Sequence, residues 1–203
     1  MANKDYPHGF NPWNEVLRAR VYPVQTAPVI AFYHGDLVQA DITGFASAKL
    51  GVTLLIYDTA VILDTSGATL KLLGSVLAVY DENMDPLPYI AVGRVGDGTT
   101  AGYLLVADHP YQQFEAQSDS GFTVANLDLN HEITVAALNA GDTDTGISVM
   151  EIDATTGAAV TVTIPIRLYG QAYPGEDVYS AAGCRMICQI NPLCHYYGSG
   201  LAV

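Results

Sequence analysis

Residues 159–168 read Ala-Val-Thr-Val-Thr-Ile-Pro-Ile-Arg-Leu, and this segment indicates the fold class most directly. Valine, isoleucine and leucine fill every second position from Val160 to Leu168, with threonine, proline and arginine between them. Alternation with a period of two is typical of a β-strand that has one face on a core and the other in water. Pro165 lacks the backbone N–H that a neighbouring strand would use, so we expect a free edge or a bulge there.

The same signal recurs through the rest of the chain, at intervals of about 8 to 12 residues. His34-Gly35-Asp36, for example, separates Val29–Tyr33 from Leu37–Ile42 and predicts a hairpin. Many short strands with regular turn signals predict an all-β protein, an antiparallel β-sandwich or barrel. The other strands that we expect are Gly51–Tyr57, Ala60–Leu63, Thr69–Leu73, Ser75–Tyr80, Tyr89–Val95, Tyr103–Ala107, Gln112–Gln117, Ile147–Ile152 and Arg185–Ile190.

The two ends of the chain differ in composition from this body. Residues 1–28 contain four prolines, which favour an extended N-terminal arm. A solvated linker rarely carries so many aromatic residues, so we expect the arm to dock on the body or on a neighbouring protein. We divide the chain into this arm, a sandwich or barrel body at 29–170, and a C-terminal strand with an almost uncharged tail at 171–203. The partner-binding residues that we predict are Tyr6, Phe10, Trp13, Arg18, Arg20, Tyr22, Tyr196 and Tyr197.

The charge of the chain narrows the choice of partners. Eight basic and 21 acidic residues give a formal net charge of −13. Such a surface repels the phosphates of nucleic acids and anionic membranes, so neither is expected as a partner. No apolar segment approaches the ~18 residues of a membrane span, and the first residues have no apolar signal region. We therefore expect synthesis in the cytoplasm, with Cys184, Cys188 and Cys194 as reduced thiols.

Two groups of residues resemble metal sites, and neither has the required spacing. Cys184, Cys188, Cys194 and His195 are zinc-ligand types, but adjacent ligands rarely converge on one tetrahedral ion. Residues 81–85 start like a calcium loop but are followed by proline where glycine is required. Asp108-His109-Pro110 is interpreted as a turn, and no nucleophile motif is present. We expect a non-enzymatic protein without metal or cofactor; a small hydrolase with dispersed carboxylates stays an alternative.

Four segments resemble, in the same order, a family of tailed-bacteriophage head structural proteins. They are the opening Met-Ala-Asn-Lys-Asp-Tyr-Pro-His-Gly-Phe-Asn-Pro at 1–12, the strand pair Leu104–Gln117, the segment Gly146–Asp153 with Thr161–Leu168 after it, and Arg185–Asn191. The three cysteines and the tyrosine-rich tail after Asn191 depart from the family pattern.

The resemblance implies a capsid decoration or cement protein that binds the major capsid protein lattice and stabilises the phage head against internal pressure. It implies a place on the outer surface of the virion after synthesis in the host cytoplasm. We expect the body to form a homotrimer, with a dimer as the alternative, because closed symmetry is the norm in such assemblies. The alternative function is a carbohydrate-binding or adhesive β-sandwich, on a virion or elsewhere, since tyrosine and tryptophan platforms with acidic loops suit sugars.

Overall fold

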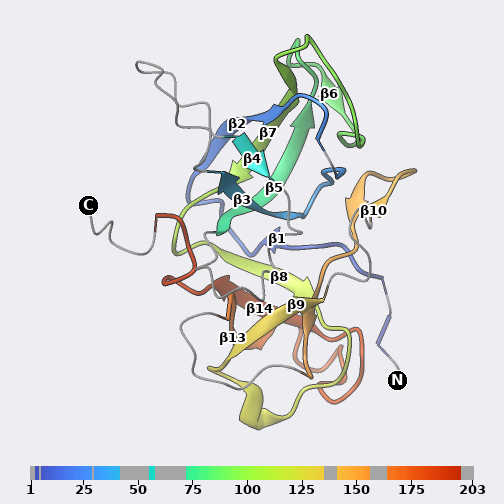
Figure 1. Cartoon of the computed structure of the whole chain (residues 1–203). Helices are drawn as coiled ribbons and strands as arrows, with labels where there is room; N and C mark the ends of the chain where they lie inside the picture. The colour runs from blue at the N-terminus through green and yellow to red at the C-terminus, as the bar shows by residue number, and fades with distance from the viewer. Residues whose placement is uncertain are drawn as a thin grey trace.

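The computed structural model describes residues 3–4, 6–28, 30–41, 55–57, 72–134, 141–155 and 164–197. Within these ranges the chain forms antiparallel β-sheets that pack as a sandwich (Figure 1), and it contains no α-helix. The all-β prediction is therefore confirmed. A 3-10 turn spans Val124–Asn126. Among the residues described, no helix has the length and hydropathy needed to cross a membrane.

The lower sheet in Figure 1 has the strand order β1-β8-β14-β13-β9-β12. Its central strands pair residues that are far apart in sequence, since β14 lies between β8 and β13. The strands are β1 (Asn11–Pro12), β8 (Gln113–Gln117), β14 (Arg185–Ile190), β13 (Ile166–Gln171), β9 (Asn130–Thr134) and β12 (Glu151–Asp153).

The upper sheet has the order β2-β7-β5-β3-β4, with β6 paired to the end of β5. Its two outer strands, β2 and β4, lie close to each other, so the sheet curls around its own apolar interior. The strands are β2 (Ala19–Gln25), β7 (Thr100–Ala107), β5 (Leu72–Tyr80), β3 (Leu37–Asp41), β4 (Leu55–Tyr57) and β6 (Pro86–Leu87). A separate hairpin pairs β10 (Gly141–Asp142) with β11 (Ile147–Ser148).

Strand alternation divides the buried side chains between two cores. Leu72 belongs to the larger core between the sheets, whereas Leu73 points into the interior of the upper sheet. Likewise, Ala107 belongs to the larger core and Val106 to the interior of the upper sheet. Successive side chains of a strand point to opposite faces, so a single strand can serve both cores. The larger core also takes residues from β8, β13 and β14, among them Phe114, Leu168, Met186, Cys188 and Ile190.

The alternating segment at 159–168 is only partly a strand in the part of the chain that the structure describes. β13 begins at Ile166, directly after Pro165, and it has a neighbour on each side. The expected free edge at Pro165 is therefore wrong: the strand starts after the proline, so no ladder hydrogen bond is lost. A register shift does occur, between Leu168 and Gly170. Residues 159–163 and the expected strand Ala60–Leu63 lie outside the described residues.

The N-terminal segment is integrated into both sheets rather than extending from the body. β1 pairs with β8 of the lower sheet, and β2 pairs along its length with β7 of the upper sheet. Between them, the Phe10 N–H donates to the Gly35 carbonyl over 2.8 Å, and the Ser75 hydroxyl donates to the Phe10 carbonyl. Figure 1 shows β1 between the two sheets. Residues 6–25 therefore link the two halves of the sandwich.

The C-terminal segment also joins the sheets. β14 is central in the lower sheet, and the residues after it reach the upper sheet. There the Leu72 N–H donates to the Cys194 carbonyl, and the Tyr196 N–H donates to the Leu72 carbonyl, each over 2.8 Å. Residues 194–196 thus pair in parallel with Leu72 at the start of β5. Strand pairing and hydrogen bonds therefore connect the segments on both sides of residues 28 and 170.

Candidate functional site

The eight predicted partner-binding residues fall into two groups. Arg18, Arg20, Tyr22 and Tyr197 gather around Asp108, with Tyr196 beside them, and we call the first four together with Asp108 the Asp108 cluster. Tyr6, Phe10 and Trp13 lie along the N-terminal segment that crosses the lower sheet.

The Asp108 cluster forms because β2 runs antiparallel to β7. The register pairs Ala19 with Ala107, which brings Arg18, Arg20 and Tyr22 to the end of β7. These three side chains share one face of the chain, because residues two apart in a strand point the same way. Asp108, directly after β7, is fully buried.

The buried Asp108 carboxylate accepts two hydrogen bonds and forms ion pairs with two arginines. Arg18 Nε donates to Oδ1 over 2.7 Å, the Tyr22 hydroxyl donates to Oδ2, and Arg20 Nε lies 3.6 Å from Oδ2. Arg18 Nη2 also donates to the Asp108 carbonyl over 2.7 Å. Burial, followed by the hydrogen bond with Asp108, raises the pKa of Tyr22 far above its ordinary value. A buried charge is tolerated in proteins where it is paired and hydrogen-bonded, as here.

Tyr197, in the C-terminal segment, contacts both arginines and Tyr22 of the cluster. The Arg18 and Arg20 guanidinium groups lie 4.9 and 5.3 Å from the centre of its ring. Its hydroxyl lies 3.3 Å from both the Tyr22 hydroxyl and Arg20 Nη1. The Tyr196 ring packs edge-on against Tyr197, with 4.9 Å between centroids. In this cluster the two ends of the chain hold each other, and the main polar groups are satisfied internally.

The remaining predicted residues differ in exposure. Phe10 is fully buried in the larger core, so it is not available to a partner in this conformation, and the same holds for Tyr22. The Tyr6 ring is exposed and has Lys4 Nζ at 5.5 Å from its centre. Trp13 is half-buried and packs edge-on against Tyr173, with ring centroids 5.6 Å apart.

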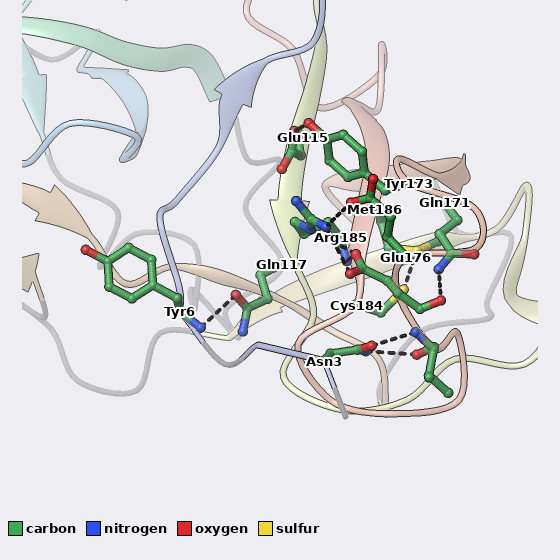
Figure 2. Close-up of polar contacts among 12 residues, drawn as sticks. Asn3, Tyr6, Glu115, Gln117, Gln171, Tyr173, Glu176, Cys184, Arg185 and Met186 are labelled. Carbon is green, nitrogen blue, oxygen red and sulfur yellow. Dashed lines mark hydrogen bonds and ion pairs between the residues drawn. The ribbon is translucent and has the colours of Figure 1, made fainter. Parts of the chain in front are cut away.

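A charged cavity of about 230 Å³ lies between the N-terminal segment and strands β8 and β14. Figure 2 shows Gln117 between Tyr6 on one side and the Glu115–Arg185 group on the other. Arg185 donates to both carboxylate oxygens of Asp177, over 2.9 and 3.0 Å, and its guanidinium group stacks 4.0 Å from the Tyr173 ring centre. The cavity is lined by Lys4, Tyr6, His8, Glu115, Gln117, Asp177 and Arg185.

The charges of this cavity are paired with one another. His8 Nε2 lies 3.5 Å from Glu115 Oε1, and the Tyr173 hydroxyl donates to Glu115 Oε2 over 3.0 Å. The contact with Glu115 raises the pKa of His8 in spite of its burial. Burial alone would raise the pKa of Glu115, but its contacts with His8 and Tyr173 outweigh burial and hold the pKa below its usual value. The contact with Glu115 attaches His8 to β8 of the lower sheet.

A shallow aromatic groove of about 170 Å³ lies next to the first residue of β8, Gln113. Trp13 and Tyr111 supply its rings, and Tyr111 is 65 % exposed. The buried Gln112 fixes both walls: Oε1 accepts from the Leu17 N–H over 2.8 Å, and Nε2 donates to the Glu15 and Gln113 carbonyls over 3.1 and 2.9 Å. The aromatic groove consists of Trp13, Asn14, Glu15, Leu17, Tyr111, Gln112 and Gln113.

The outer side of the upper sheet is an uncharged apolar face. The strand register forms two rows across β2, β7 and β5, and all six side chains are at least partly exposed. Val21, at 46 % exposure, is the most exposed of them. The rows are Val21–Leu105–Ala78 and Pro23–Tyr103–Tyr80.

The residues that resembled metal ligands serve other purposes. Cys184, Cys188 and Cys194 are buried in the larger core and form no disulfide, and burial raises the pKa of Cys184 to about 11. Asp81 Oδ1 accepts the N–H groups of Asn83 and Asp85, each over 2.8 Å, so this carboxylate caps its own turn. In the described ranges, no three histidine, cysteine or acidic side chains are grouped so that they could hold a metal ion.

Sequence reasoning missed Tyr111, Gln112 and Gln113 as site residues, because they lie within a segment with ordinary strand patterning. The sequence signal that could have pointed to these residues is the adjacent turn at Asp108-His109-Pro110. Comparison of the chain with protein-family models, with curated proteins and with solved structures gives no match.

Proposed function

We propose that this chain is a capsid decoration or cement protein that binds the major capsid protein lattice of a tailed-phage head from outside and stabilises it against internal pressure. The apolar face of the upper sheet is the observation that carries the proposal. Three neighbouring strands present six uncharged side chains to the surface of a chain whose net charge is −13.

This composition suits a protein interface. The centre of such an interface is depleted in charged residues and enriched in aromatic side chains. The two rows of the apolar face contain no charged residue and include the tyrosines Tyr103 and Tyr80. The acidic remainder of the surface keeps the chain soluble and unattracted to packaged nucleic acid. Repetition of a modest contact over a closed lattice multiplies its strength through avidity. A homotrimer would add to this effect, and a dimer would do so to a smaller extent.

The experiment is co-sedimentation of the full-length protein with empty shells of the matching major capsid protein. Deleting residues 1–20 would remove β1, Phe10 and the start of β2, so point variants are the better tool. Val21→Asp combined with Tyr80→Ser places a charge on the apolar face, and we expect at least a 100-fold loss of affinity with little change in thermal stability.

The matched control is Val124→Asp, which adds the same charge at a side chain that is 77 % exposed on the 3-10 turn of the lower half. This control should bind shells like the unchanged protein. If the unchanged protein stays in the supernatant, or if the double variant binds as well as the control, the proposal is wrong.

A further inference from the structure

We propose that the aromatic groove is a binding site for a neutral carbohydrate, a function separate from lattice binding by the apolar face. The groove is a different surface, since it lies beside the lower sheet and the apolar face belongs to the upper sheet. Some polar groups of the groove have internal partners and others have none, and this difference indicates the kind of ligand.

The backbone of the groove is held in place before any ligand arrives. Besides the three hydrogen bonds of the Gln112 side chain, the Trp13 N–H donates to the Gln113 carbonyl over 2.8 Å. On the opposite wall the Tyr111 N–H donates to His109 Nδ1 over 3.2 Å, and the Gln112 N–H donates to the His109 carbonyl over 2.9 Å. A preorganised site loses little conformational entropy on binding.

The side chains that face the groove, by contrast, have unused hydrogen-bonding capacity. The indole N–H of Trp13, the amides of Asn14 and Gln113, the carboxylate of Glu15 and the hydroxyl of Tyr111 make no hydrogen bond to another described residue. Together they offer donors and acceptors around two aromatic rings. A ligand that covers them must supply both kinds of group, since a buried polar group without a partner costs about 1–3 kcal/mol.

This requirement selects among ligand classes. An anion would meet Glu15 and no cationic lining side chain, on a chain of net charge −13. A lysine or arginine side chain would suit Glu15 and the rings, but it accepts nothing from the indole and amide N–H groups. An apolar peptide side chain would leave all of these groups unpartnered. A neutral sugar satisfies both needs, because each hydroxyl donates and accepts and its C–H faces pack on the negative faces of aromatic rings.

The surface beyond the groove extends this chemistry over the lower sheet. Strand register places Gln113 opposite Gln189, and Gln189 opposite Arg167 on β13. Gln189 is fixed by a 2.9 Å hydrogen bond from its Nε2 to the Pro110 carbonyl and by a 2.8 Å hydrogen bond from the exposed Tyr169. A third ring therefore stands along the same face, so the site fits an oligosaccharide better than a single sugar.

The test uses the full-length protein on an array of neutral hexose and N-acetylhexosamine oligosaccharides, with sialylated and sulfated counterparts. We expect binding to a subset of the neutral glycans and none to the acidic ones. Calorimetry with the best neutral glycan should then show at least a tenfold loss of affinity for Tyr111→Ala, which removes an exposed ring. Val124→Ala, remote from the groove, should bind like the unchanged protein.

A second variant addresses charge. Glu15→Gln keeps an acceptor and should hold neutral-glycan affinity within threefold, while admitting acidic glycans that the unchanged protein rejects. The inference is overturned if no neutral glycan binds, if only acidic glycans bind, or if Tyr111→Ala binds normally. Loss of capsid-shell binding in Tyr111→Ala without any glycan binding would likewise overturn it and would identify the groove as a protein interface.

Discussion

The Asp108 cluster and the aromatic groove both combine aromatic rings with a carboxylate, and they differ in how their polar groups are used. They are neighbours in sequence, since residues 13–17 of the groove lead directly into residues 18–22 of the cluster. In the cluster, two arginines and a tyrosine are directed at a buried carboxylate. In the groove, an indole, two amides, a carboxylate and a phenol face outward around a backbone that is fully fixed.

This contrast shows which arginines and aromatic residues indicate a binding surface. A tyrosine or arginine whose polar group has a buried internal partner contributes to stability, and removing the partner exposes a desolvation cost. The same side chain without an internal partner contributes little to stability and is available to a ligand. Variants in the two regions should therefore separate folding from binding.

The largest expected effect is that of Asp108→Ala. It leaves the Tyr22 hydroxyl without its acceptor and the two arginines without their counter-charge. Because both guanidinium groups are partly exposed, we expect a loss of about 3 kcal/mol in the free energy of unfolding, at the low end for a broken buried pair. Urea denaturation measures it.

Two comparisons sharpen this result. Asp108→Asn keeps an acceptor for Tyr22 and should lose less stability than Asp108→Ala, although the charge is gone. Glycan and shell binding by the folded fraction should be unchanged in both variants. A loss below about 1 kcal/mol for Asp108→Ala would show that the cluster does not hold the two chain ends together.

A somewhat smaller effect is expected from His195, which is buried beside the Asp108 cluster. Nδ1 accepts from the Tyr197 N–H over 3.0 Å, and Nε2 has no hydrogen-bond partner among the residues that the structure describes. Burial lowers the pKa of His195 to about 4, with Arg18 and His109 acting in the same direction and Asp108 against it. Between pH 6.5 and 4 the unfolded chain therefore binds the proton that the folded chain excludes, and stability falls as the pH falls through this window, by at most about 3 kcal/mol.

His195→Gln isolates this contribution, because the glutamine oxygen can replace Nδ1 as an acceptor without titrating. Other histidines act in the same pH range: burial lowers the pKa of His34, and the contact with Glu115 raises that of His8. The measurement is therefore the difference in unfolding free energy between the unchanged protein and the variant at pH 7 and pH 4.5. If that difference is independent of pH, His195 is not buried in its neutral form.

Several strands were predictable from sequence because their signal is local, but the expected strand Tyr89–Val95 forms only an isolated bridge from Ile90 to Phe32. The sequence pattern predicted Gln112–Gln117 and Arg185–Ile190, which agree within one residue with β8 and β14. It also predicted Tyr103–Ala107, which is the second part of the longer β7. The apolar face was not predicted, since it depends on which strands are neighbours. Val21 and Leu105 lie opposite each other only because β2 pairs with β7 in one particular register.

The sites were less predictable, because polar contacts connect distant parts of the chain. Arg18 and Asp108 are 90 residues apart, and Asp108 by itself indicated only a turn. Residue type suggested Phe10 and Tyr22 as partner contacts, yet both pack inside the chain. Pro7 and Pro12 suggested an extended arm that docks on the body or on a neighbouring protein, and the extended conformation that they favour is the one that β1 needs to pair with β8.

The smallest expected change in stability is that of Gln112→Ala, and it connects the two regions. The substitution removes an acceptor for the Leu17 N–H and two donated hydrogen bonds, all of them partly buried, and the shorter side chain lets water reach the groups that lose a partner. We expect a loss of about 1–2 kcal/mol in the free energy of unfolding. Glycan affinity should fall at least as far as in Tyr111→Ala, although Gln112 offers no free group to a ligand, because both walls of the groove lose their fixed separation.

Gln112→Glu is the matched variant for this argument. Its carboxylate can still accept from the Leu17 N–H, but it repels the Glu15 and Gln113 carbonyls, so one wall stays attached and the other is released. Hydrogen exchange at the Leu17 amide should remain slow in Gln112→Glu and become fast in Gln112→Ala, whereas both variants should lose glycan affinity. Normal affinity in either variant would mean that the groove does not depend on a fixed backbone, and the contrast with the Asp108 cluster would then reduce to a difference in exposure.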